Sequence, residues 1–335
     1  MVHHNPDLSA SEIAHIWESY MADTMNICIM NHFLTNVEDE EIKVIIQHTK
    51  ALSEGNLNSL AAIFEKEGIP LPQGFTEHDL NANAPRLFSD VMYLRYLKYM
   101  GKTGADMNSM AFGTSFREDI RAFYMSAFKE SANLYDKVIR LMESKGLLTR
   151  TPFIAYPEKA EFIQDDEGFL GGYLTLQKRP LLAMEVTHLA NNIDANSIGK
   201  KLMDGFAQVC ESKEVRDHLQ NGSELAYEII KTLEEKLKEN ETDPPVSSDV
   251  VITDSTVAPF SDKLIVWLTS SLTALSITKV GQAISASPRS DLIAEYTQLT
   301  AQILKYSSAG AKISIKNNWL EKPPQTLDRK KLMEE

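Results

Sequence analysis

The chain has 335 residues, of which 43% are hydrophobic and 24% charged, an ordinary composition for a globular protein with a sizeable core. Its formal net charge of -13 argues against non-specific binding of nucleic-acid phosphates or anionic membranes, because both need basic patches. We therefore expect no nucleic acid and no membrane among its partners. The two cysteines, Cys28 and Cys210, lie in apolar helical patterns and predict buried free thiols rather than a disulfide framework.

The N-terminus and the hydropathy pattern predict a cytoplasmic protein. The chain opens with Met-Val-His-His-Asn-Pro, which lacks the apolar segment of a signal peptide. No run approaches the roughly eighteen uncharged apolar residues of a membrane span.

Two long helices are predicted at the start of the chain. The first opens with a capping box, Ser9-x-x-Glu12, and carries an apolar stripe to about residue 36. The second begins near residue 38, where acidic residues favour a helix start, and ends near residue 66. A segment of about fifteen residues rich in proline and glycine follows, which is long enough to cross the height of a helical bundle.

Two further helices are predicted after this crossing. Ala84-Pro85 favours a helix start, because proline is tolerated in the first turn, and the pattern continues to about residue 112. A short turn at residues 113–115 separates it from a fourth helix over about 116–145, so these two helices should be antiparallel. Two short turns and one long central crossing are the connectivity of a ferritin-like four-helix bundle.

The second half of the chain repeats the first. Landmarks from Phe88 to Pro152 return after a shift of 172 residues, among them Asp90 as Asp262 and Arg117 as Arg289. A shift of 173 relates the first helices, and the following residues recur: Glu12, His15, Phe33, Glu38, Glu41 and Gln47 as Glu185, His188, Phe206, Glu211, Glu214 and Gln220. We therefore expect an all-α protein of two tandem ferritin-like four-helix bundles, over residues 8–155 and 180–330. A polar linker over 156–179 joins them, and one short strand is allowed within it.

Several local motifs together resemble one family. They are Gly74-Phe75-Thr76, Asn81-x-Asn83-Ala84-Pro85-Arg86-Leu87, Pro259-Phe260-Ser261-Asp262-Lys263 and Trp319-Leu320-Glu321-Lys322-Pro323-Pro324. The sequence is similar over nearly its whole length to the domain of unknown function 3231 (DUF3231), a family of spore-forming Bacillus-type bacteria. The resemblance implies a ferritin-like fold and a loose kinship with spore coat proteins of the coat-F type, and it implies no activity.

A ferritin-like fold raises the hypothesis of a carboxylate-bridged two-metal site. That site needs Glu-x-x-His on two helices and a glutamate from each of two others, all pointing inward. The chain offers Glu12-x-x-His15 and Glu185-x-x-His188, one pair per repeat, but neither fourth helix contains a histidine, and His48 has no counterpart at the repeated position. We therefore favour a capping glutamate followed by a histidine that is partly buried near a bundle end. Ser9 explains Glu12 in this way, whereas Leu182 occupies the capping position of the second repeat and leaves Glu185 unexplained. If iron, manganese or zinc binds, its expected ligands are Glu12, His15, Glu185, His188 and then His48.

Other repeated residues have structural explanations that we also prefer. Asp90 and Arg117, like their counterparts, lie 27 residues apart and so near opposite ends of an antiparallel helix pair, which favours helix capping and salt bridges over a shared catalytic role. Tyr124 and Tyr296 should pack in the core with their hydroxyls hydrogen-bonded to neighbours. Tyrosines and methionines over residues 92–110 are more typical of a core than of a ligand pocket.

These patterns predict a non-enzymatic structural or interaction protein without a cofactor. Protein partners or self-association are expected, and the resemblance adds a possible place in sporulation or the spore coat. Two alternatives stay open: a divergent metal-binding bundle that uses the Glu-x-x-His pairs, and a binder of a small apolar ligand.

Overall fold

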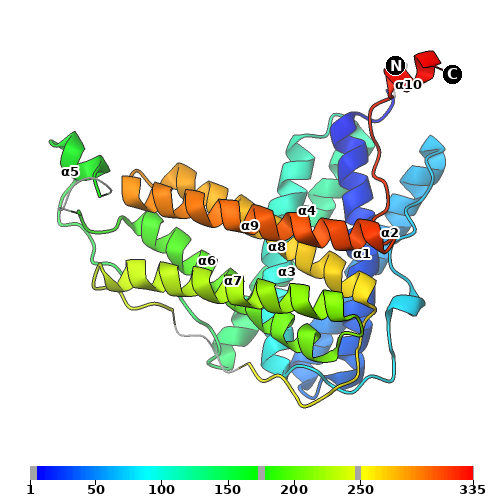
Figure 1. The fold of residues 1–335 in the computed structure, drawn as a ribbon, viewed down its shortest axis with the longest axis horizontal. Helices are drawn as coiled ribbons and strands as arrows, with labels where there is room; N and C mark the ends of the chain where they lie inside the picture. The colour runs from blue at the N-terminus through cyan, green and yellow to red at the C-terminus, as the bar shows by residue number, and fades with distance from the viewer. Residues whose placement is uncertain (1–5, 173–177, 246–249, 335) are drawn as a thin grey trace. The chain divides into compact units, whose positions relative to one another are not determined.

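The computed structural model describes residues 6–172, 178–245 and 250–334, and this part of the chain is helical (Figure 1). No strand forms within these ranges, although Phe88 and Ile252 form an isolated antiparallel bridge. The predicted all-α class is therefore confirmed. The chain divides into two compact units: unit 1 contains Met1–Leu80, Leu97–Ile139 and Asn318–Glu335, and unit 2 contains Asn81–Tyr96 and Arg140–Asn317.

Unit 1 is built from the first four long helices of the chain. Helix α1 (Ala10–Asn36) packs against α2 (Glu40–Glu67), and most of α3 (Asp90–Gly113) and α4 (Glu118–Ser144) belongs to the same unit. A single turn of 3-10 helix, η1 (Glu77–Asp79), and the short helix α10 (Arg329–Glu334) complete it.

The core of unit 1 draws side chains from all four long helices. Its buried members are Ile16, Leu60, Phe64, Ala111, Ile120 and Tyr124. Because α1, α2, α3 and α4 each contribute to this cluster, removal of any one helix would expose apolar surface of the others.

Unit 2 contains four long helices, each packed against two of the others. Helix α6 (Ala183–Val209) lies along α7 (Lys213–Lys238) and α8 (Asp262–Ala286), and α9 (Ser290–Lys316) lies along α7 and α8. Short turns join α6 to α7 and α8 to α9, whereas more than twenty residues separate α7 from α8. The short helix α5 (Asp166–Leu170) precedes this set.

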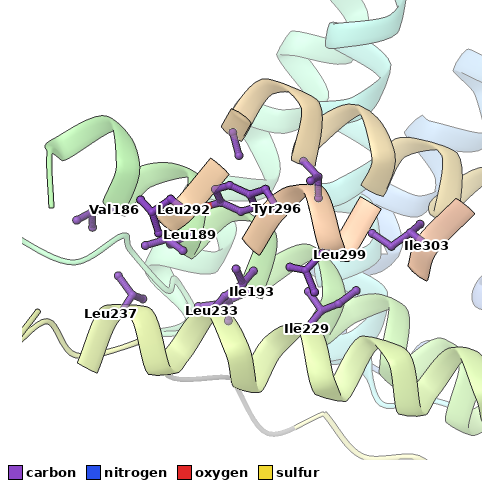
Figure 2. Close-up of a cluster of buried hydrophobic side chains, with 12 residues drawn as sticks. Val186, Leu189, Ile193, Ile229, Leu233, Leu237, Leu292, Tyr296, Leu299 and Ile303 are labelled. Atoms are coloured by element: carbon purple, nitrogen blue, oxygen red, sulfur yellow. The ribbon is translucent and has the colours of Figure 1, made fainter. Parts of the chain in front are cut away.

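The core of unit 2 lies between facing helices, as Figure 2 shows. Its members are Val186, Leu189, Ile193, Ile229, Leu233, Leu237, Val280, Ala283, Leu292, Tyr296, Leu299 and Ile303. They come from α6, α7, α8 and α9 at helical spacing, so one apolar stripe of each helix faces the centre.

The predicted start of the third helix was wrong. Helix α3 begins at Asp90 rather than at Ala84, because residues 86–89 are extended and pair with the segment 251–253 within unit 2. The amide of Ser89 donates to Val251 O at 3.0 Å, and the amide of Thr253 donates to Leu87 O at 2.9 Å. The repeated Ser-Asp pair, not the Ala-Pro pair, marks these helix starts.

The described part of the linker over residues 156–179 holds the short helix α5. Residues 173–177 lie outside the described ranges, so a short strand in this linker stays a prediction. Asp165 caps α5, since its carboxylate accepts a hydrogen bond from the Gly168 amide at 3.1 Å.

One described helix is long and apolar enough to cross a membrane by length and composition alone. This helix, α8, has a mean hydropathy of 1.4 over its most apolar window, of which 39% is buried in the structure. The core helix of a folded protein meets the same criteria. Serines and threonines interrupt its apolar residues, so the sequence shows no unbroken apolar run of membrane-span length here. The absence of a membrane partner stays a prediction.

Candidate functional site

The carboxylate of Glu12 lies at one end of unit 1 and joins two helix starts. As the sequence predicted, Ser9 and Glu12 form a capping box on α1, with the Ser9 amide 2.8 Å from Glu12 Oε2. The other oxygen, Oε1, accepts hydrogen bonds from the amides of Phe116 at 2.8 Å and Arg117 at 2.7 Å, just before α4. Burial opposes the charge of Glu12, but these N–H donors outweigh it and lower its pKa to about 2.

Arg117 completes this end of unit 1 with a network of ion pairs. Its guanidinium donates to both oxygens of Asp119, at 3.1 and 2.7 Å, and lies 2.8 Å from Glu67 at the end of α2. Lys66 reaches Asp119 at 3.1 Å. Hydrogen bonds from Arg117 depress the pKa of Asp119 well below its usual range despite burial. The salt-bridge interpretation of Arg117 is therefore confirmed.

His15 and His48, the two predicted histidine ligands in unit 1, each lie beside another polar side chain. His15 Nε2 lies 3.0 Å from Thr114 Oγ1, in the turn between α3 and α4. His48 Nε2 lies 3.2 Å from the Lys137 ammonium, and burial together with that positive charge lowers the pKa of His48. A cation beside His48 disfavours a second cation there.

The equivalent glutamate of unit 2 has a different partner. Glu185 is fully buried, and the guanidinium of Arg179 donates hydrogen bonds to both of its oxygens, at 2.8 Å to Oε2 and 2.9 Å to Oε1. The Leu182 amide donates to Oε2 at 2.8 Å. The guanidinium of Arg179 also lies over the Phe169 ring, 4.6 Å from its centre. Leu182 provides no side-chain cap. Arg179 therefore takes the place of the Ser9 hydroxyl only as a donor to the glutamate carboxylate.

Arg289 holds the same end of unit 2 as Arg117 does in unit 1. It donates to both oxygens of Asp291, at 2.8 and 2.9 Å, and to the carbonyl of Arg179 at 2.9 Å. It also donates to Asn240 Oδ1 at 3.1 Å, beyond the end of α7. Arg289 is completely buried, and its charge lowers the pKa of Asp291 against the effect of burial. The chain before α6, the end of α7 and the start of α9 thus meet at one guanidinium.

The predicted metal ligands are divided between the two units. Glu12, His15 and His48 belong to unit 1, and Glu185 and His188 belong to unit 2. Among the residues described, no three His, Cys, Asp or Glu side chains lie close enough to hold an ion. Both glutamates already accept hydrogen bonds on each oxygen. Metal binding by these residues stays a prediction for elemental analysis.

The two repeated tyrosines differ in a way that the sequence did not indicate. The hydroxyl of Tyr124 lies 3.3 Å from Ser19 Oγ, as expected. The hydroxyl of Tyr296 is buried without a hydrogen-bond partner among the described residues, so the expectation was wrong for the second repeat. Burial raises the pKa of both phenols.

Unit 1 contains a cluster of polar side chains on α1 and α2 that the sequence analysis did not predict. Asn26 donates to Ser53 Oγ at 2.7 Å, and Ser53 and Asn56 both hydrogen-bond the carboxylate of Asp23. Desolvation raises the pKa of Asp23 to about 7, in spite of these two donors. Asn26 Oδ1 is buried and accepts no hydrogen bond from the described residues. The signal was present, since Asp23 and Asn26 interrupt the apolar stripe at a spacing of three.

Comparison with known proteins identifies the family. The model of the family described as protein of unknown function (DUF3231) matches residues 1–160 and 171–332. The chain belongs to the DUF3231 family. No curated protein matches this DUF3231 chain.

One solved structure similar to this DUF3231 chain is a crystal structure from Bacillus halodurans, described as that of a candidate spore coat protein. The two are 18% identical, with a TM-score of 0.39, over 47% of this chain and 98% of the other.

Two motifs of the DUF3231 resemblance lie together in unit 1. Glu321, from the C-terminal Trp-Leu-Glu-Lys motif, accepts hydrogen bonds from the amides of Gln73 and Gly74, at the start of Gly74-Phe75-Thr76. The contact joins residues almost 250 positions apart in the chain.

Proposed function

We propose that this DUF3231 protein is a non-enzymatic structural or interaction protein built from two ferritin-like four-helix bundles that arose by internal duplication. The observation that supports the proposal is that its repeated charged residues hold the ends of helices. Glu12 and Glu185 each hold a helix start, and Arg117 and Arg289 each tie helix ends together. Each of these charged groups has partners at the ends of helices, which supports a structural role for them.

The connectivity of unit 2 supports the ferritin-like part of the proposal. Four helices pack each against two others, with short turns at α6–α7 and α8–α9 and a long central crossing. Ferritin-like bundles also have one long connection, so this connectivity supports the proposal. The first four long helices have the same pattern of short, long and short connections.

An association with sporulation is the further part of the proposal, and it rests on the family resemblance. We expect antibodies against the protein to detect it in purified spores of the source organism and not in exponentially growing cells. Detection at equal levels in growing cells and absence from spores would remove this part. The interaction role would then be tested by the purified protein alone.

A further inference from the structure

The C-terminal segment places a carboxylate on two successive backbone amides of the loop that follows α2. Gln73 N donates to Glu321 Oε2 and Gly74 N donates to Glu321 Oε1, both at 2.8 Å. Successive N–H groups that converge on one anion form a concave binding site. A carboxylate held by two such donors makes charge-assisted hydrogen bonds, which are stronger than neutral ones.

The loop that supplies these amides is fixed by α1. The Phe75 amide donates to Thr24 Oγ1 at 3.2 Å, and the Cys28 thiol donates to Thr76 O at 3.4 Å. Gly74 has φ +62°, and a Cβ there would lie 2.6 Å from Thr24 Oγ1. Glycine is therefore required at this position, and the two amides are held in place by contacts that do not involve the C-terminal segment.

The C-terminal segment contacts unit 1 with alternate residues. Trp319 and Glu321 are half-buried, whereas Leu320 and Lys322 are exposed, as expected for an extended chain with one side against a surface. Residues 323–330 are exposed as well. Glu321 lies near Tyr20 of α1, whose pKa is raised by burial and by this negative charge.

The segment begins where the chain passes from unit 2 to unit 1. Helix α9 ends at Lys316, and Asn318 adopts a left-handed conformation with φ 56°. Asn317 is the last residue of unit 2 and Asn318 the first of the C-terminal part of unit 1. A terminal segment joined at such a boundary can leave and return without disrupting a helix, which is the condition for exchange between copies.

We propose that residues 70–76 of unit 1 form a peptide-docking site. Its ligand within one chain is the C-terminal segment 319–322, which Glu321 anchors. Its partner between chains is the same segment of a second copy of the protein. The inference rests on the interaction role proposed above. Its test uses purified protein, so its failure would be distinguishable from a negative result in spores.

The first experiment measures docking with a fluorescently labelled peptide of residues 317–327. Full-length wild type and the full-length variant Glu321→Gln are titrated, with fluorescence anisotropy as the readout. We expect the peptide to bind the variant at least about tenfold more tightly than the wild type, because the wild-type segment competes at high effective concentration. A peptide carrying glutamine in place of Glu321 should bind the variant at least about tenfold more weakly.

Two further variants control this experiment. Lys322→Gln changes the exposed neighbour of the anchor and should behave as wild type. Gly74→Ala in the Glu321→Gln background alters the receiving loop and should abolish binding, while circular dichroism confirms that the helices remain. Equal affinity for the two peptides, or no binding to Glu321→Gln, would overturn the docking site.

The second experiment tests the partner by light scattering over a range of protein concentrations. Wild type and Lys322→Gln should form reversible dimers as concentration rises, and Glu321→Gln should remain monomeric. A wild type that stays monomeric up to about millimolar concentration, the range of an effective concentration for a tethered segment, would overturn the second copy as the partner. Equal dimerisation of Glu321→Gln would overturn it too.

Discussion

Glu12 and Glu185 occupy equivalent positions in the two repeats, yet different groups hold them. Backbone amides of two helix starts surround Glu12, whereas the guanidinium of Arg179 grips Glu185. In both units the carboxylate stabilises a bundle end, but only in unit 2 does it depend on one opposite charge. A carboxylate repeated in two halves of a chain can therefore indicate that both helix starts need an anion, without indicating a common catalytic or metal-binding role.

Loss of Arg179 should be the largest single effect. Arg179→Ala leaves Glu185 fully buried without its cation, which should lower the free energy of unfolding by about 3–5 kcal/mol in urea denaturation. The matched control is the double variant Arg179→Ala, Glu185→Gln, which should be more stable than the single variant because no charge is left buried. A loss below about 1 kcal/mol in the single variant would mean that Arg179 does not hold this end of unit 2.

Removal of Glu12 should cost less, because the donors that it satisfies can partly be reached by water. Glu12→Ala should lower the free energy of unfolding by about 2 kcal/mol at neutral pH. The pKa of Glu12, at about 2, lies below its ordinary value, so its contribution is complete above about pH 4.5 and is lost as pH falls towards 2. Wild type and variant should therefore converge in acid denaturation, and a constant difference from pH 7 to pH 2 would contradict this account.

The pKa of Asp23 is shifted in the opposite direction to that of Glu12. Its pKa of about 7 lies above the ordinary value, so the carboxyl ionises in the unfolded chain at a lower pH than in the folded protein. The free energy of unfolding therefore falls as pH rises from about 4 to about 7. The second repeat carries Asn196 at the matching position. Asp23→Asn should therefore stabilise the protein by about 2 kcal/mol at pH 8 and have little effect at pH 4. A variant less stable than wild type at pH 8 would show that the Asp23 carboxylate is needed.

His15 should matter least. Its ring makes a hydrogen bond to Thr114 at an exposed site, so His15→Ala should change the free energy of unfolding by about 0.5 kcal/mol, well below the effect of Glu12→Ala. Chemical denaturation of the two variants side by side measures the difference. Equal losses would show that glutamate and histidine act as one unit.

Regular features of the fold could be predicted from the sequence because they depend on local patterns. Ser9 and Glu12 lie three residues apart, so their capping box was visible, and the apolar stripes located the long helices. The start of α3 could not be predicted in this way, because residues 86–89 pair with a segment far along the chain. Ala84-Pro85 is compatible with a helix start, but tertiary pairing prevailed.

The site was less predictable for the same reason. The partner of Glu185 is Arg179, which precedes the helix and lies outside any capping motif. The amide of Gly74 donates to Glu321, which lies near the other end of the sequence. The sequence singled out Glu185 and the motifs that contain Gly74 and Glu321, but not Arg179, and only the fold shows which residues contact one another.

Metal content decides whether the repeated glutamates are structural anchors or metal ligands. It is measured in the untagged protein, purified without chelator, beside the double variant His15→Ala, His188→Ala. If the repeated glutamates are anchors of the bundle ends, neither protein will hold iron, manganese or zinc near stoichiometry, and both will unfold at similar temperatures. Near-stoichiometric metal in the wild type that disappears in the variant would contradict this account and make the Glu-x-x-His pairs a metal site.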